Sequence, residues 1–181
     1  MATTAITKWA IDPAHSEVGF KAKHLMITTV SGKFEQFEGS IETEGDDLST
    51  AKITFTANTD SVNTASEQRD GHLKSVDFFE PAKYPKLKFV STKFEKISDE
   101  KYKLHGDLTI RDVTKPVHLD VNYGGMAKDP WGNIKAGFEV DGKINRKDWG
   151  LNWNVTLEAG GLLVSDEVKI HCQVQVTKLP A

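Results

Sequence analysis

The chain has 181 residues, with 23 lysine and arginine residues, 26 aspartate and glutamate residues and a formal net charge of −3. This length fits a single domain over residues 1–181 with a core of its own. Charges of both signs are scattered singly along the chain. Their near balance argues against a nucleic acid or an anionic membrane as partner, because either partner requires a basic face.

The cysteine content and the N-terminus bear on the compartment. Cys172 is the only cysteine, so no intrachain disulfide can form and folding does not require an oxidising compartment. Residues 1–8 lack the basic start and apolar core of a secretory signal, and no apolar run reaches membrane-spanning length. The sequence therefore predicts a cytoplasmic protein without an integral membrane segment. A periplasmic protein whose signal had been removed would show the same pattern.

Apolar residues at every second position predict antiparallel strands through most of the chain. In residues 18–24, the apolar side chains and His24 share one face while lysines occupy the other. Phe34 and Phe37 have opposite parity, so both can face inward only if a bulge lies near residues 35–36. Further strands are expected near residues 34–41, 53–57, 87–91, 104–110, 117–123, 136–144 and 168–176.

One helical segment interrupts the strands. Thr64 and Glu67 have the spacing of a capping box, in which two side chains satisfy the first free amides of a helix. A helix is therefore expected from about residue 65 to 75, with Arg69 and His72 on one side of it.

About eight such strands suit either a closed barrel or a sandwich, and periodicity does not separate the two. The inner faces mix aromatic residues with small ones. Small residues let side chains interdigitate in a packed core, whereas in a ligand-holding barrel they leave room. Both interpretations stay open for Ala22, Gly39, Ala57, Gly106, Ala136 and Gly142.

Motifs for catalysis or metal binding are missing from the sequence. The six histidines show no spacing typical of a zinc site, and neither Cys-x-x-Cys nor His-Glu-x-x-His occurs. There is no Gly-x-Ser-x-Gly, and no glycine pair leads into a phosphate-binding loop. Cys172 lies on the inward face of an apolar strand, which hides the sulfur and raises the pKa of the thiol. We therefore expect no catalytic residue, no metal and no cofactor.

Three polar residues fall where a ligand could reach them. His24 has the inward parity of an apolar strand, so it is either a buried histidine with one hydrogen-bond partner or a contact for a ligand. Arg69 and His72 pose the same choice near one end of the barrel. Arg69 could instead form an ordinary ion pair with Asp77 or Glu80.

Several segments between Trp9 and Val176, taken in their order along the chain, form a recognisable set. The most specific is the segment at 69–79, Arg-Asp-Gly-His-Leu-Lys-Ser-Val-Asp-Phe-Phe. The others are residues 11–20, 24–25, 30–34, 84–85, 106–117, 144–150 and 164–170. Through these segments the chain resembles the YceI-like, polyisoprenoid-binding family.

The resemblance implies an all-β fold, an eight-stranded antiparallel lipocalin-like barrel with a short helix near one end. It implies an elongated apolar pore that holds a polyisoprenoid, an isoprenoid quinone tail or a similar long-chain lipid. It also implies no enzymatic mechanism and, often, a homodimer. Many members are exported to the periplasm, and this chain departs from them by showing no signal peptide.

With this fold, we expect ligand contacts from inward-facing apolar residues and from apolar and polar residues near the mouth. These are Phe20, His24, Phe34, Phe37, Phe55, Arg69, His72, Leu73, Phe78, Phe79, Phe89, Leu108 and Phe138.

The predicted function is to carry or store a long apolar molecule inside the barrel. One alternative is an enzyme on a lipid-like substrate, with His24, Arg69 or His72 as acid–base groups. Another is a protein-interaction module that uses loop tryptophans at Trp131 or within residues 149–153. Such tryptophans can equally cap the ends of a barrel.

Overall fold

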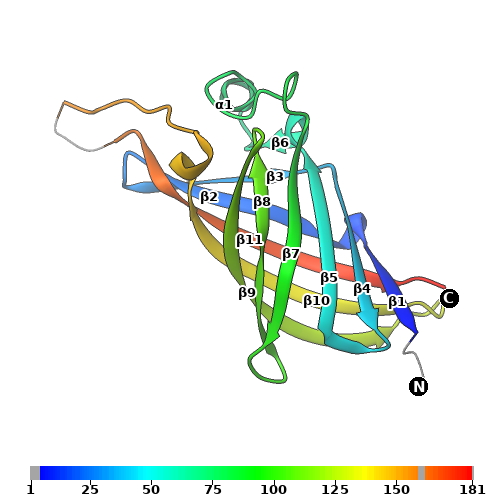
Figure 1. The fold of residues 1–181 in the computed structure, drawn as a ribbon. Coiled ribbons are helices and arrows are strands. Elements are labelled where there is room, and N and C mark those ends of the chain that lie inside the picture. Colours follow the sequence, from blue (N-terminus) through cyan, green and yellow to red (C-terminus); the bar gives the residue numbers. More distant parts are fainter. Residues whose placement is uncertain (1–4, 159–161, 181) are drawn as a thin grey trace.

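The computed structural model describes residues 5–158 and 162–180 as a closed, antiparallel barrel of eight strands (Figure 1). Pairing of the first and last strands closes the ring. In order around it, the strands are β1 (Ile6–Ile11), β4 (Phe37–Glu44), β5 (Asp47–Asn58), β7 (Lys86–Lys96), β8 (Lys101–Ile110), β9 (Val113–Lys128), β10 (Ile134–Asn145) and β11 (Val164–Lys178).

Three further strands extend this wall at one end of the barrel. The last strand is long enough to have two partners along the same edge: Ile11 of β1 pairs with Val176, and Val18 of β2 (Glu17–His24) pairs with Cys172. The strands β3 (Thr28–Phe34) and β6 (Val62–Asn63) continue outward from β2. The predicted strands thus included β2, whereas β1, which closes the ring, and β3 were missed.

The predicted bulge near residues 35–36 is wrong. Phe34 ends β3 and Phe37 begins β4, so a change of strand, not an extra residue within one strand, accounts for their opposite parity. Register shifts occur elsewhere, for example between Gly137 and Phe138 in β10.

The one α-helix among the described residues, α1 (Glu67–Leu73), is shorter than expected and has a different cap. Ser66 is the N-cap, and its hydroxyl accepts a hydrogen bond of 3.3 Å from the Arg69 backbone amide. The predicted capping box is therefore wrong, because the Thr64 hydroxyl binds side chains of the helix instead. Figure 1 shows α1 above one end of the barrel, with the chain termini at the other end.

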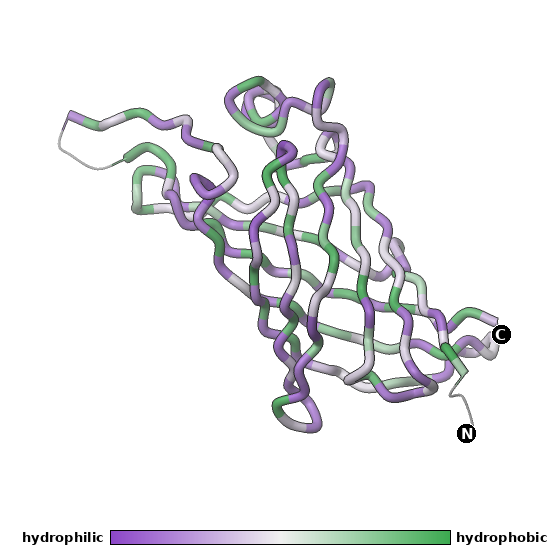
Figure 2. The backbone as a smooth tube through the Cα atoms, viewed as in Figure 1, coloured by the Kyte–Doolittle hydropathy of each residue, from purple (hydrophilic) through white to green (hydrophobic). Residues whose placement is uncertain are grey.

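Three short 3-10 turns join or follow strands: η1 (Pro13–His15), η2 (Thr59–Ser61) and η3 (Arg146–Trp149). Asp12 caps the first of them, because its carboxylate accepts a hydrogen bond of 3.1 Å from the Ala14 amide. The same carboxylate is 3.2 Å from Lys135 Nζ on β10. This contact joins the end of β1 to β10, which lies on the other side of β11. Figure 2 shows hydrophobic and hydrophilic residues alternating along the strands, as the period-two pattern predicted.

Candidate functional site: an apolar cavity inside the barrel

A cavity of about 730 Å³ occupies the interior of the barrel. Its wall is made by inward-facing side chains of the strands and is almost wholly apolar. Val140, Ile144 and Ile170 face inward yet remain only half-buried, because open space adjoins them. A close-packed core would bury such side chains fully. The interior is therefore hollow, with a volume typical of sites for small apolar ligands.

The small residues of the inner faces serve both of the roles considered from the sequence. Ala22 and Gly39 border the cavity. Gly106 instead makes room for a ring, because a Cβ there would lie 2.4 Å from Cζ of Phe89. Some small residues thus allow tight packing within the wall, and others leave space for the cavity.

The end of the cavity away from α1 is closed by a small apolar cluster. Trp9, Ala136 and Val176 are at most 2% exposed and pack against one another there. Trp9 Nε1 donates a hydrogen bond of 3.1 Å to Thr43 Oγ1, which satisfies the polar atom of a buried indole. Trp9 and Val176 also border the cavity, so it runs most of the length of the barrel.

The other end of the cavity reaches the surface beside α1, where Gln68 and Arg69 border it and are exposed. The predicted ligand contacts lie along this cavity with one exception. Phe37 does not border it, and its ring packs 6.2 Å from that of Phe55. The residues that do border it are Phe20, His24, Phe34, Phe55, Arg69, His72, Leu73, Phe78, Phe79, Phe89, Leu108 and Phe138.

His24 lies at the outer end of β2, at the rim of the cavity. It is exposed, so the interpretation as a buried histidine is wrong. Its side chain has the inward parity that the sequence predicted, but the strand carries it past the end of the closed part of the barrel.

Arg69 holds the segment that precedes α1. Its Nε donates 2.8 Å to Thr64 Oγ1, and its Nη2 donates 2.6 Å to the Thr64 carbonyl. The Asp70 carboxylate accepts a hydrogen bond of 2.8 Å from the Thr64 amide. The alternative of an ion pair between Arg69 and Asp77 or Glu80 is wrong. Asp77 pairs with His72 instead, and Glu80 pairs with Arg111. Arg69 thus shapes the mouth through Thr64.

His72 belongs to α1 and contacts the chain segment after η3. Its Nε2 is 2.9 Å from Asp77 Oδ2, which fixes the orientation of the imidazole. Its ring meets those of Phe78 and Trp153 edge-on, at centroid distances of 5.1 and 4.4 Å. These four side chains join α1 to the opposite rim of the mouth.

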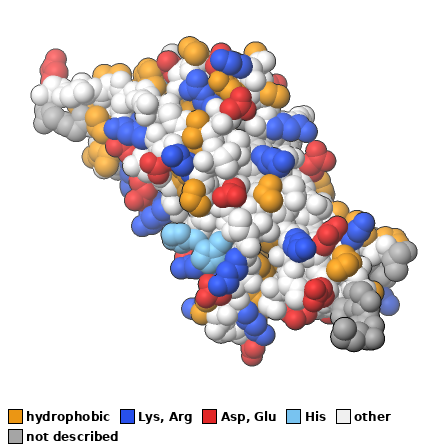
Figure 3. All heavy atoms as spheres, in the orientation of Figure 1, with side chains coloured by type: hydrophobic (Ala, Val, Ile, Leu, Met, Phe, Trp, Pro, Cys, Tyr) orange, Lys and Arg blue, Asp and Glu red, His pale blue; other side chains and the backbone are white. Residues whose placement is uncertain are grey.

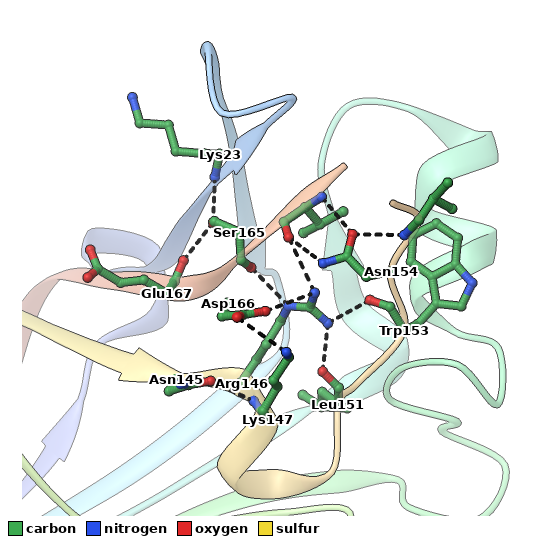
Figure 4. A network of polar contacts seen from close by, with 12 residues as sticks. Lys23, Asn145, Arg146, Lys147, Leu151, Trp153, Asn154, Ser165, Asp166 and Glu167 are labelled. Carbon is green, nitrogen blue, oxygen red and sulfur yellow. Dashed lines mark hydrogen bonds and ion pairs between the residues drawn. The ribbon is translucent and has the colours of Figure 1, made fainter. Parts of the chain in front are cut away.

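Arg146 is a buried cation that the sequence did not single out. It is 3% exposed, and its guanidinium donates to the backbone carbonyls of Leu151, Trp153, Val164 and Ser165 (Figure 4). Burial lowers the pKa of the Arg146 guanidinium, while nearby Asp166 opposes that fall.

The role of Arg146 is to fasten two ends of one segment. Leu151 follows η3 and Ser165 lies in β11, so the four carbonyls come from both sides of the segment between them. The guanidinium borders the cavity, but these carbonyls occupy donors on all three of its nitrogens. Arg146 therefore fixes the rim and is poorly placed to bind a ligand.

Cys172 lies on the inner face of β11 and borders the cavity, as its parity predicted. Burial raises the pKa of its thiol to about 11. A thiol in this environment is a poor nucleophile near neutral pH.

The three tryptophans of the C-terminal half lie in three different settings. Trp149 is 2% exposed, and its Nε1 donates 2.9 Å to the Leu108 carbonyl, so it caps the barrel. Trp153 borders the cavity at the mouth. Trp131 is exposed on the turn between β9 and β10, so the capping interpretation is wrong for this residue.

One group of side chains on the outer surface could hold a metal ion. Within the described part of the chain, Glu139, Asp141 and His171 bring their ligand atoms within 4.8 Å of one another. His171 Nδ1 lies 2.6 Å from Asp141 Oδ1, so an ion pair accounts for the contact without a metal. The search for metal-binding motifs in the sequence did not find this group, because its residues lie on two strands that come together only when β10 pairs with β11.

Among the described residues, no helix has the length and apolar character needed to cross a membrane. The space-filling view of one face shows charged side chains of both signs interspersed over the strands (Figure 3).

The comparisons with known proteins agree on one family. The model of the YceI-like domain matches residues 9–176. A UPF0312 protein of Staphylococcus aureus strain MSSA476 is 39% identical over 171 residues, covering 94% of this chain and 97% of that protein.

Solved structures show the same fold. The YCEI protein of Campylobacter jejuni is 38% identical, with a TM-score of 0.76, and the match covers 93% of this chain and 96% of that one. A polyisoprenoid binding domain from Saccharophagus degradans, implicated in plant cell wall breakdown, is 16% identical with a TM-score of 0.69, covering 94% and 98% of the two chains. The latter likeness concerns the fold alone.

Proposed function

Because the chain belongs to the YceI-like family, we propose that its barrel holds one long apolar molecule, as a carrier or store and not as an enzyme. The class of ligand is a polyisoprenoid, an isoprenoid quinone tail or a similar long-chain lipid. The observation that carries the proposal is the cavity of about 730 Å³ with apolar walls, closed at Trp9 and reaching the surface beside α1.

The physical basis is the transfer of apolar surface out of water. Each methylene group that a ligand buries contributes about 0.8 kcal/mol. The apolar walls offer few partners for hydrogen bonds, so a polar molecule would lose its bonds to water on entering. The cavity therefore favours a chain of carbon and hydrogen over a polar ligand of the same size.

The polar residues of the rim suit a head group that stays at the mouth. His24 and Arg69 border the cavity where it meets solvent, and His72 lies next to them in the wall. Arg69 uses Nε and Nη2 on Thr64, so its other terminal nitrogen can donate to a carbonyl, hydroxyl or phosphate of the ligand. The Saccharophagus degradans neighbour is a polyisoprenoid binding domain of the same fold, so the fold is compatible with this class of ligand.

Native mass spectrometry and solvent extraction of the purified protein test the proposal. We expect a bound apolar chain that can be removed and replaced by an added prenyl lipid. Ala22→Trp places an indole in the cavity and should prevent uptake, whereas Lys52→Trp, on an outward-facing position of β5, should leave it unchanged. Failure to find or load any apolar chain in a folded protein would overturn the proposal.

The same preparation tests the alternative of an enzyme. A carrier or store returns its ligand chemically unchanged after long incubation. A product that forms with the wild type and is lost in His72→Ala or Arg69→Ala would show catalysis at the mouth.

A further inference from the structure

The hairpin between β2 and β3 ends in an apolar tip. Leu25, Met26 and Ile27 are consecutive and are 37%, 55% and 76% exposed. Exposed apolar residues are common singly, but three in a row at the end of a projecting hairpin form a patch. This tip consists of residues 25–27 throughout the following paragraphs.

The backbone conformation of the tip is unusual for these residues. The Ile27 amide donates 3.1 Å to the His24 carbonyl, and Leu25 and Met26 have φ values of +54° and +60°. Turns with two left-handed residues favour Asn and Gly, because a branched or long side chain is strained there. Strained residues of this kind cluster at functional sites.

The hairpin that carries the tip is basic. It carries Lys21, Lys23 and Lys33, and its only acidic residue is Glu17 at the base, far from the tip. All three lysines are exposed. The net charge of the whole chain argued against an anionic surface as partner, but the charge of this hairpin is positive.

The tip adjoins the mouth of the cavity. The Leu25 amide donates 2.9 Å to the Leu163 carbonyl, and both His24 and Leu163 border the cavity. The Leu163 amide in turn donates 3.0 Å to the carbonyl of Val155, another exposed apolar residue. Figure 1 shows the hairpin and the segment after η3 projecting together from the end of the barrel that carries α1, and Figure 2 shows hydrophobic residues at the turn of the hairpin.

We propose that the tip inserts into the surface of a bilayer that contains anionic phospholipids and holds the mouth of the barrel against it. The apolar side chains enter the boundary between head groups and acyl chains, and the lysines pair with anionic head groups. An apolar chain then passes between bilayer and cavity without crossing water. The docking stands on the tip and its charge, whereas the passage of a chain rests on the function proposed above.

Flotation with vesicles of phosphatidylcholine and phosphatidylglycerol, at a ratio of seven to three, measures the docking. Ile27→Asp should lower the bound fraction at least about tenfold, because one large apolar side chain no longer enters the bilayer. The matched control is Ile97→Asp, since Ile97 is also exposed, at 58%, but lies on the turn between β7 and β8. Lys21→Gln and Lys23→Gln should each weaken binding about fivefold at low salt, with the difference lost in high salt.

A second measurement separates docking from ligand binding. Wild type and Ile27→Asp should take up a prenyl lipid from detergent equally well, whereas only the wild type should extract it rapidly from the vesicles. If the wild type fills its cavity from detergent but does not bind vesicles, or if Ile97→Asp loses binding as Ile27→Asp does, the docking proposal is overturned and the carrier function stands. If the wild type binds vesicles but never takes up a lipid, the carrier function fails and the docking stands.

Discussion

Replacing Arg146 should loosen the rim of the barrel and lower the stability of the whole protein. In Arg146→Ala the carbonyls of Leu151, Trp153 and Ser165 lose the guanidinium as donor. The Val164 carbonyl loses only a weak bond of 3.4 Å and keeps one of 2.7 Å from Asn154 Nδ2. Each hydrogen bond from a charged donor contributes about 1.5–3 kcal/mol, and the guanidinium regains its hydration in the unfolded chain. The expected net loss is about 3–5 kcal/mol in the free energy of unfolding.

The assay is urea unfolding at neutral pH, followed by circular dichroism, with a thermal scan beside it. For a chain of this length the loss corresponds to a fall of roughly 6–20 °C in Tm. Arg146→Lys should recover part of the loss, because an ammonium group has three donors where the guanidinium has five.

Lys147→Ala is the matched control. Lys147 is the neighbouring cation, is exposed, and contributes a surface ion pair of 3.3 Å with Asp166, for which we expect a loss of at most about 1 kcal/mol. If Arg146→Ala costs no more than Lys147→Ala, the carbonyls do not depend on the guanidinium and the reasoning is refuted. Hydrogen exchange of the amides in residues 151–158 should speed up in Arg146→Ala alone, because their anchor is lost.

Three further predictions concern the cavity and the pH dependence of folding. Burial raises the pKa of the Cys172 thiol from 9.0 to about 11. Near pH 7 this thiol should therefore react with Ellman's reagent at least about 100-fold more slowly than a free cysteine. A comparable rate would show that the thiol is accessible and ionised. Partial burial raises the pKa of Asp12, but its hydrogen bonds to His15 and Lys135 outweigh this and hold the pKa below the usual 3.8. Its contribution is therefore present above about pH 4 and lost as the pH falls through the lowered pKa. Acid titration of unfolding should show a smaller loss of stability in Asp12→Asn than in the wild type, and equal slopes would contradict this. The binding of prenyl alcohols can be measured by displacement of a fluorescent lipid. The binding free energy should become more favourable by up to about 0.8 kcal/mol per added methylene and level off when the chain fills the cavity. If the affinity does not depend on chain length, the ligand does not bind inside the barrel.

Local patterns in the sequence were sufficient to predict which side chains of a strand face inward and which face outward. A side chain in a strand points to one face or the other with a period of two, so the inward parity of Phe20, Phe89 and Cys172 follows from their positions alone. The strand expected near residues 104–110 is β8, which Arg111 and Asp112 join to β9. Such features depend on a few neighbouring residues and can be predicted from them.

The predictions that failed depended on three-dimensional geometry that residue spacing alone does not give. The spacing of Thr64 and Glu67 is that of a capping box, but Arg69 and Asp70, five and six residues from Thr64, bind it instead. Phe37 has the right parity for the cavity, yet it does not border the cavity and its ring packs against that of Phe55.

By itself the sequence determined the strand faces, the apolar character of the interior and, through its resemblance to the YceI-like family, the closed barrel. Only the tertiary structure decided that the interior is a cavity and where that cavity opens, because side-chain volumes fill or fail to fill a space whose size depends on how the sheet closes. It also decided the roles of Arg146, whose carbonyl partners lie up to 19 residues away, and of the basic hairpin beside the mouth. These roles arise from segments that only the closed sheet brings together.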